Sequence, residues 1–125
     1  MNSGKKYGKK TWLIPDGFYN SKSTGAVSHE AVCVLNTGDN DAEINMTLYF
    51  EDRHKMPGFK SYCLAGRTHH IRMDKLLSVS GQSVPMDTAY AILVESSVEV
   101  VVQYSRLDTS QAEMALMTTV AYPVE

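Results

Sequence analysis

The fold is decided by residues 42–50, which read AEINMTLYF. Apolar residues stand at every second position of this stretch, from Ala42 through Met46 to Phe50, and the positions between them start with Glu43 and stay mostly polar. Alternation with a period of two is typical of a β-strand that has one face in the core and the other toward solvent. The sequence therefore predicts a half-buried strand here.

Further strand-like stretches flank this strand. Residues 30–35, EAVCVL, are apolar on both faces, which is typical of a strand covered by a second sheet or by a neighbouring subunit. The run NTGDND at 36–41 supplies turn-forming residues and predicts a hairpin between 30–35 and 42–50. We expect a second hairpin between residues 59–64 and residues 67–73.

The C-terminal third is also rich in strand-forming residues. Residues 89–95 and 98–104 hold many Val, Ile and Tyr residues, and Ser96-Ser97 between them predicts a two-residue hairpin connection. Residues 111–117 favour a helix by propensity, whereas 118–122 favour a strand. We expect a strand in this second half.

Taken together, these stretches predict an all-β fold. Strands that follow one another with turns every few residues are typical of an antiparallel β-sandwich, and we expect a jelly-roll-like sandwich of about eight short strands. A chain of 125 residues has the usual length of one domain, and we assign residues 11–125 to it. Residues 1–10 hold four lysines, and we expect them to form a flexible basic tail.

The charge distribution restricts the classes of partner. Four of the twelve basic residues lie in the tail, which leaves eight against fourteen acidic residues in the domain, and an acidic body argues against nucleic acid as a partner. No stretch has the apolar length of a membrane span or of a signal-peptide core, so we expect a cytoplasmic protein. Cys33 and Cys63 lie in apolar runs and indicate reduced core residues rather than a disulfide.

Titratable residues open the strand at 30–35. His29 and Glu30 are adjacent, so on an extended strand their side chains point to opposite faces and a joint metal or acid-base role is geometrically awkward. The alternative to a functional role is a structural one, in which His29 and Glu30 belong to a cluster of hydrogen bonds at the strand end. A zinc site that joins His29, His70 and a carboxylate across strands lacks the usual histidine spacing, so we expect neither a metal nor another cofactor.

The stretch 103–108, QYSRLD, ends a Val-rich strand with a run of polar groups. Arg106 and Asp108 share a face if the strand continues that far. On that face they either bind a polar ligand or form an ion pair with each other. Arg72 with Asp74 repeats this mixture of charges. Arg67 is better explained as part of a solvated face.

The aromatic residue Trp12 and the carboxylate of Asp16 stand near a Pro-Asp-Gly turn. An aromatic platform beside a carboxylate suits a sugar or another polyol, although the sole tryptophan of a small sandwich is more often part of the core. The chain has no Gly-x-Ser-x-Gly elbow, no phosphate-binding glycine loop and no cysteine beside a plausible base. We therefore expect a protein that is not an enzyme.

Several short motifs, spread over nearly the whole chain after the basic tail, form a recognisable set. They are, in chain order, Trp12, Asp16-Gly17-Phe18, Ser28-His29-Glu30, Cys33 to Asn36, Gly38-Asp39, Arg67-Thr68, His70, Arg72, Pro85, Asp87-Thr88, Val101 to Gln103, Arg106 to Asp108, Gln111 to Glu113, Ala115-Leu116, Thr119 and Ala121-Tyr122. With these motifs the chain resembles the sensory-rhodopsin-transducer family, named for the soluble partner of a cyanobacterial light-sensing rhodopsin.

The resemblance implies a β-sandwich that assembles as a homotetramer and acts in sensing or transduction. It further implies a small-molecule-binding domain for sugars or related metabolites. The residues shared with the family become the candidate ligand-binding set, which consists of Trp12, Asp16, His29, Glu30, Asn36, Arg67, His70, Arg72, Gln103, Arg106 and Asp108.

Two functions from different classes follow as hypotheses. The first is a sensor domain that binds a sugar or a related small polar metabolite. The second is a signalling adaptor that binds a membrane sensory rhodopsin or another receptor protein. An oligomer is expected in either case, because the apolar stretches 31–35 and 98–102 offer more hydrophobic face than one small sandwich covers.

Overall fold

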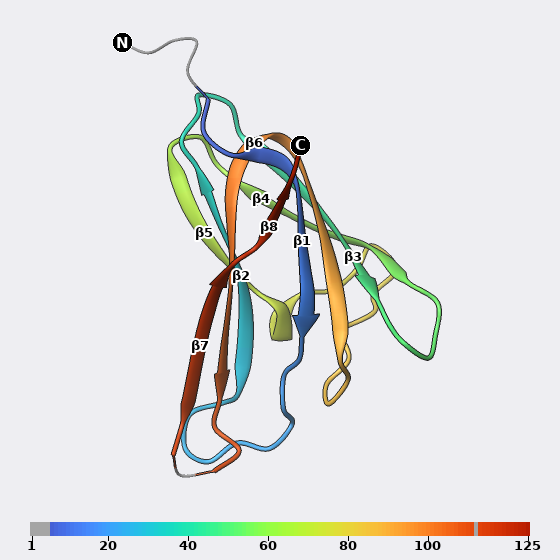
Figure 1. Cartoon of the computed structure of the whole chain (residues 1–125). Coiled ribbons are helices and arrows are strands. Elements are labelled where there is room, and N and C mark those ends of the chain that lie inside the picture. Colours follow the sequence, from blue (N-terminus) through green and yellow to red (C-terminus); the bar gives the residue numbers. More distant parts are fainter. Residues whose placement is uncertain (1–5, 112) are drawn as a thin grey trace.

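The computed structural model describes residues 6–111 and 113–125 (Figure 1). The first five residues of the expected basic tail therefore lie outside the described residues. The first strand begins at Lys9, and the Nζ atom of Lys9 lies 2.9 Å from a carboxylate oxygen of Glu125. The sheet thus starts two residues before the boundary that we drew between tail and domain.

The described residues form eight strands and one short 3-10 helix. They are β1 (Lys9–Gly17), β2 (His29–Asn36), β3 (Ala42–Tyr49), β4 (Met56–Cys63), β5 (Arg67–Arg72), the 3-10 helix η1 (Met73–Lys75), β6 (Tyr90–Asp108), β7 (Ala115–Val120) and β8 (Tyr122–Val124). All pairings between strands are antiparallel. The expected all-β class is confirmed, and no helix of the described chain is long and apolar enough to cross a membrane.

Two layers of strands share the long strand β6 (Figure 1). In the first layer the strand order is β4-β3-β6-β1-β8, and it uses the first half of β6. In the second layer the order is β5-β2-β6-β7, and it uses the second half of β6. The expected antiparallel sandwich is confirmed, with β6 as the strand that connects its two layers.

The predicted hairpin at Ser96-Ser97 is wrong, because β6 runs through these residues without a turn. Ser96 is 8% exposed and continues the inward-facing series of Val94 and Ile92. The backbone N–H of Glu43 in β3 donates to the Oγ atom of Ser97 at 2.9 Å. Tight hairpin turns favour Gly or Asn with positive φ, and two serines do not supply that chemistry.

The two other predicted hairpins are also wrong in their pairing. Strand β2 pairs with β5 and β6, whereas β3 pairs with β4 and β6. The connections from β2 to β3 and from β4 to β5 therefore pass from one layer to the other. Turn residues at 36–41 determine that the chain reverses direction, but they do not determine which sheet the next strand joins.

The period-two pattern of β3 is confirmed by its burial. Ala42, Ile44, Met46 and Leu48 are fully buried, and the residues between them are exposed or half-buried. The expected strand near the C-terminus is present too, but β7 starts at Ala115. No described residue of 111–117 is helical, and residue 112 lies outside the described part.

Candidate functional site

A fully buried carboxyl group lies near one end of the sandwich. Glu30 is the second residue of β2 and is 0% exposed. Its Oε2 atom accepts hydrogen bonds from the hydroxyl of Tyr104 and, at 3.1 Å, from the backbone N–H of Phe18, which follows β1. Three segments that are distant in the sequence therefore meet at this one carboxylate.

Arg106 extends this cluster toward the surface. It stands opposite Glu30 in the pairing of β2 with β6. The Nε atom of Arg106 donates to the hydroxyl oxygen of Tyr104 at 3.1 Å, and its Nη2 atom lies 3.6 Å from a carboxylate oxygen of Asp16. We call Asp16, Glu30, Tyr104 and Arg106 the Glu30 cluster.

The Glu30 cluster leaves hydrogen-bonding capacity unused. The Oε1 atom of Glu30 and the Nη2 atom of Arg106 are both inaccessible to solvent, and neither forms a hydrogen bond in the structure. Buried polar atoms are nearly always hydrogen-bonded, because an unpaired one keeps the full cost of leaving water. These two atoms are therefore suited to receive a further polar partner.

Burial shifts the acidity of this cluster. Loss of solvation raises the pKa of the Glu30 carboxyl to about 7, and the hydrogen bonds from Tyr104 and Phe18 and the charge of Arg106 oppose this rise only in part. Burial, followed by the nearby Glu30 charge, also raises the pKa of the Tyr104 hydroxyl. Glu30 thus exchanges its proton near neutral pH while Tyr104 stays protonated.

Arg106 also lines an open pocket of about 270 Å³ between β6 and β7. We call it the Arg106 pocket. The other residues that line it are Asp108, Ser110, Gln111, Glu113, Ala115 and Met117. Strand β6 continues to Asp108, so the side chains of Arg106 and Asp108 reach the same pocket. Asp108 also accepts a hydrogen bond from the backbone N–H of Ser110 at 2.9 Å.

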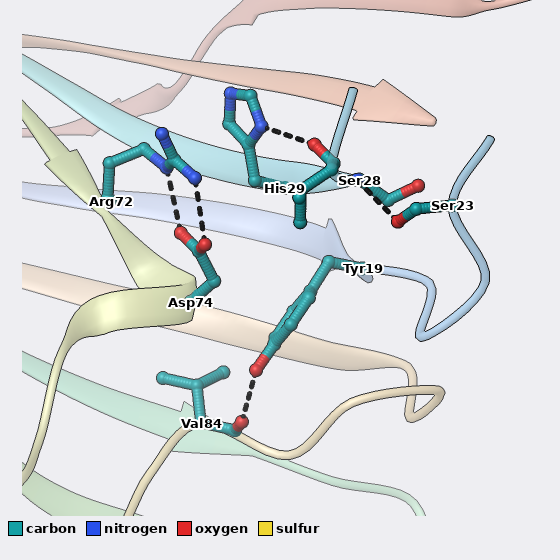
Figure 2. Close-up of polar contacts among 8 residues, drawn as sticks. Tyr19, Ser23, Ser28, His29, Arg72, Asp74 and Val84 are labelled. Atoms are coloured by element: carbon teal, nitrogen blue, oxygen red, sulfur yellow. Dashed lines mark hydrogen bonds and ion pairs between the residues drawn. The ribbon is translucent and has the colours of Figure 1, made fainter. Parts of the chain in front are cut away.

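A second polar group lies around the start of β2 and the end of β5, and Figure 2 shows it. The guanidinium of Arg72 donates two hydrogen bonds of 2.8 Å to the carboxylate of Asp74. Burial acts to raise the pKa of the Asp74 carboxyl, but the hydrogen bonds and the charge of Arg72 outweigh it and hold that pKa below its ordinary value. The Nδ1 atom of His29 lies 2.9 Å from the carbonyl oxygen of Val27.

The loop between β1 and β2 is tied down beside both groups. The Oγ atom of Ser28 accepts a hydrogen bond from the backbone N–H of Thr109 at 2.8 Å and donates to the carbonyl of Lys22 at 2.9 Å. The hydroxyl of Tyr19 donates to the carbonyl of Val84 at 2.8 Å (Figure 2). These bonds fix the chain that carries the Phe18 amide toward Glu30.

Other candidate residues lie elsewhere. Asn36 is at the far end of β2 from Glu30, and Arg67 stands opposite Asn36 in β5. Trp12 is 4% exposed, and its indole N–H donates to the carbonyls of Lys9 and Val100, so it packs in the core.

His70 and Gln103 both stand opposite Cys33 in the second layer, on the side of β2 that faces away from Glu30. The structure thus brings together Asp16, Glu30, Arg106 and Asp108. It places His29 and Arg72 in the second polar group, and the remaining candidates lie outside both. In residues 6–111 and 113–125, no three His, Cys, Asp or Glu side chains are placed to hold a metal ion.

Sequence reasoning missed Tyr104, Ser110 and Glu113 as members of the site. Tyr104 was detectable, because it stands two residues before Arg106 on the same strand and so shares its face. Ser110 and Glu113 follow the end of β6, and no periodic pattern there points to the pocket.

Comparisons with known proteins agree with this architecture. A family model described as Anabaena sensory rhodopsin transducer matches residues 7–123. The solved structure of Thermotoga maritima 1070 is 36% identical, with a TM-score of 0.86 over 96% of this chain and 98% of that chain. The Anabaena sensory rhodopsin transducer is 35% identical, with a TM-score of 0.74 over 87% of this chain and 96% of that chain. A search of curated proteins found no match. The chain belongs to the Anabaena sensory rhodopsin transducer family.

Proposed function

We propose that this chain is a signalling module that binds a small polar metabolite, such as a sugar or a related polyol, in the Arg106 pocket. The observation that carries the proposal is the unused hydrogen-bonding capacity of the Nη2 atom of Arg106, a residue that lines this pocket. A ligand at the pocket would supply the partner that the protein does not. Binding without chemical turnover is part of this proposal.

The lining of the Arg106 pocket supports this ligand class. The guanidinium of Arg106 donates hydrogen bonds, the carboxylates of Asp108 and Glu113 accept them, and the side chains of Ser110 and Gln111 do both. The hydroxyl groups of a sugar are donors as well as acceptors and so match such a mixed set. Ala115 and Met117 offer an apolar surface for the carbon face of a ring.

A thermal-shift screen against sugars, sugar acids and polyols tests the proposal. A ligand that binds only the folded state, present at about 100 times its Kd, stabilises that state by roughly 3 kcal/mol and raises the melting temperature. Arg106→Ala is expected to abolish this shift, since it removes the central donor of the pocket. Arg67→Ala is the matched control and is expected to retain it, because Arg67 lies at the other end of β2 and β5.

Two outcomes contradict the proposal. If no compound in the screen moves the melting temperature of the wild-type protein, the metabolite role is lost. If a compound shifts wild type, Arg106→Ala and Arg67→Ala equally, the ligand binds outside the Arg106 pocket. Each variant is compared with its own ligand-free melting temperature, so any loss of stability from the substitution itself does not enter the comparison.

A second candidate function is that of an adaptor for a membrane sensory rhodopsin. It is favoured by family membership and by the 35% identity to a protein named sensory rhodopsin transducer. Binding of the chain to a sensory rhodopsin in lipid nanodiscs, followed by surface plasmon resonance, tests it. If the adaptor role needs no metabolite, the wild-type chain and the Arg106→Ala variant are expected to bind the rhodopsin equally well.

The proposal also includes a homotetramer and a cytoplasmic location, as implied by the family resemblance. Cys33 and Cys63 are both free thiols in the structure, which is the usual state of cysteines in a reducing compartment. Light scattering of the purified chain measures the mass of the assembly directly, and a monomer at micromolar concentration would contradict the tetramer.

A further inference from the structure

A second open pocket lies on the first layer of strands. It has a volume of about 370 Å³ and is lined by Pro15, Asp16, Tyr49, Phe50, Glu51, Ala89, Tyr90 and Ala91. We call it the aromatic pocket, because three of these residues are aromatic. None of them lines the Arg106 pocket, so the two pockets are separate.

An irregularity in the pairing of β1 with β6 shapes the aromatic pocket. The start of β6 runs between β1 and β3 in the first layer (Figure 1). The register of β1 against β6 shifts between Ile14 and Gly17, so Pro15 and Asp16 together stand opposite the single residue Ala91. Such a β-bulge redirects side chains and is frequent beside binding sites. The small side chain of Ala91 leaves the space next to the bulge open.

The rings of the aromatic pocket are placed to attract positive charge. The rings of Phe50 and Tyr90 meet edge to face, with their centroids 6.1 Å apart. The guanidinium carbon of Arg53 lies 5.1 Å from the centroid of the Phe50 ring, and the Nζ atom of Lys55 lies 5.9 Å from that of Tyr49. Both distances are typical of cation–π contacts. Neither cation lines the pocket, so its interior stays free for another one.

The polar side chains of the aromatic pocket are acceptors rather than donors. Asp16 and Glu51 contribute two carboxylates, and apart from the tyrosine hydroxyls no side chain of the lining can donate a hydrogen bond. The side chain of Asp16 is 73% exposed despite its ion pair with Arg106, and Glu51 forms no ion pair with any described residue. A sugar needs donors as well as acceptors, so this lining suits a cation better than a sugar.

Tyr90 adds an unsatisfied polar group to the lining. The residue is 3% exposed, and its hydroxyl forms no hydrogen bond within the described part of the chain. Buried hydroxyl groups are nearly always hydrogen-bonded, because an unpaired one keeps the full cost of leaving water. A ligand in the aromatic pocket that carries a hydroxyl group would provide the partner.

We propose that the aromatic pocket binds a small organic ammonium ion, of the chemical class of choline. Aromatic faces attract a quaternary ammonium group although it has no N–H to donate. The two carboxylates add attraction for its charge, and the alanine and proline side chains offer apolar surface to its methyl groups. The inference does not depend on the proposed metabolite, because the two pockets share no lining residue.

Isothermal titration calorimetry with choline chloride tests the inference. The comparison compound is dimethylbutanol, the neutral isostere of choline in which a carbon atom replaces the nitrogen. Choline is expected to bind at least about tenfold more tightly than this isostere, because only choline carries the charge that the rings and carboxylates attract. All titrations are made at the same ionic strength, since salt screens exposed carboxylates.

Two variants locate the binding. Glu51→Gln removes one exposed carboxylate and is expected to weaken choline binding by about fivefold. Ala91→Leu fills the space beside the bulge and is expected to abolish binding. Glu43→Gln is the matched control and is expected to bind like the wild type, because Glu43 is an exposed carboxylate near the other end of β3. Thermal melts show whether each variant is folded.

The inference is overturned if the wild-type protein does not bind choline, or binds the neutral isostere equally well. It is also overturned if folded Glu51→Gln and Ala91→Leu variants keep the wild-type affinity. An equal loss in Glu43→Gln and Glu51→Gln would show that choline responds only to the overall negative charge. A sugar that raises the melting temperature of a protein without affinity for choline would disprove this inference alone and leave the proposed function intact.

Discussion

Replacing Asn36 by alanine is expected to lower the free energy of unfolding by about 3 kcal/mol, since three backbone groups lose their hydrogen bond to its side chain. The side chain is fully buried. Its amide donates to the carbonyls of Asn40 and Cys63 at 2.9 and 3.0 Å, and its Oδ1 atom accepts from the N–H of Gly38 at 3.0 Å. The amide thus holds the turn between β2 and β3 against the end of β4.

Urea unfolding measures this loss, and Asn45→Ala is the matched control. Asn45 is a half-buried residue of β3, and its replacement is expected to change the free energy of unfolding by about 0.5 kcal/mol or less. Asn36→Ala is also expected to leave ligand binding in the Arg106 pocket unchanged, because Asn36 lies at the other end of β2. A stable Asn36→Ala variant that has lost ligand binding would show that this residue belongs to the site after all.

The stability of the protein is expected to fall as the pH rises through neutrality, because of Glu30. Burial raises the pKa of its carboxyl from 4.5 to about 7. Between these two values the folded state keeps the proton and the unfolded state releases it, so the unfolded state binds fewer protons and the free energy of unfolding decreases with pH. The contribution is present in full below pH 4.5 and is lost as the pH rises through about 7.

The size of this loss follows from the shift in pKa. A difference of one pKa unit corresponds to about 1.4 kcal/mol, so the shift of Glu30 accounts for roughly 3 kcal/mol between acidic and mildly basic pH. Glu30→Gln, which is neutral at every pH, is expected to remove this part of the pH dependence. Urea unfolding of the wild type and of Glu30→Gln over a pH series measures the difference between their free energies of unfolding at each pH. Both proteins contain the same histidines, so the histidine contributions cancel in this difference.

Glu43→Gln provides the control for this experiment. Glu43 is an exposed residue of β3, and the variant is expected to keep the pH dependence of the wild type. If Glu30→Gln and wild type lose stability in parallel between acidic and mildly basic pH, the Glu30 carboxyl does not hold its proton in the folded state. The description of the Glu30 cluster as a site that exchanges a proton near neutral pH would then be wrong.

Part of the candidate site was readable from the sequence. The stretch 103–108 predicted that Arg106 and Asp108 share a face, and both line the same pocket in the structure. The opposite orientation of His29 and Glu30 was likewise predictable, because neighbouring residues of a strand alternate. The sequence did not predict that Glu30 contacts Tyr104 and the amide of Phe18, since these three residues come from separate segments of the chain.

The amino-acid sequence by itself determined the all-β class, the position and burial of β3 and the family of the protein. Period-two alternation is a local property of an extended chain, so a single strand such as Ala42–Tyr49 displays it without reference to any partner. Family motifs are local in the same sense, because short runs of residues carry them. Both kinds of pattern can therefore be recognised without knowledge of the rest of the structure.

Only the tertiary structure decided which strands pair, that β6 runs unbroken through Ser96-Ser97, and which candidate residues meet. Turn residues reverse the chain equally well within one sheet and between two sheets, and the choice depends on which apolar faces can be buried together. The same holds for Asn36, whose amide could have faced a ligand but is consumed by backbone groups of Asn40, Cys63 and Gly38. The contact between Asn36 and Cys63 joins two strands of different layers, and a sequence pattern records only neighbours in the chain.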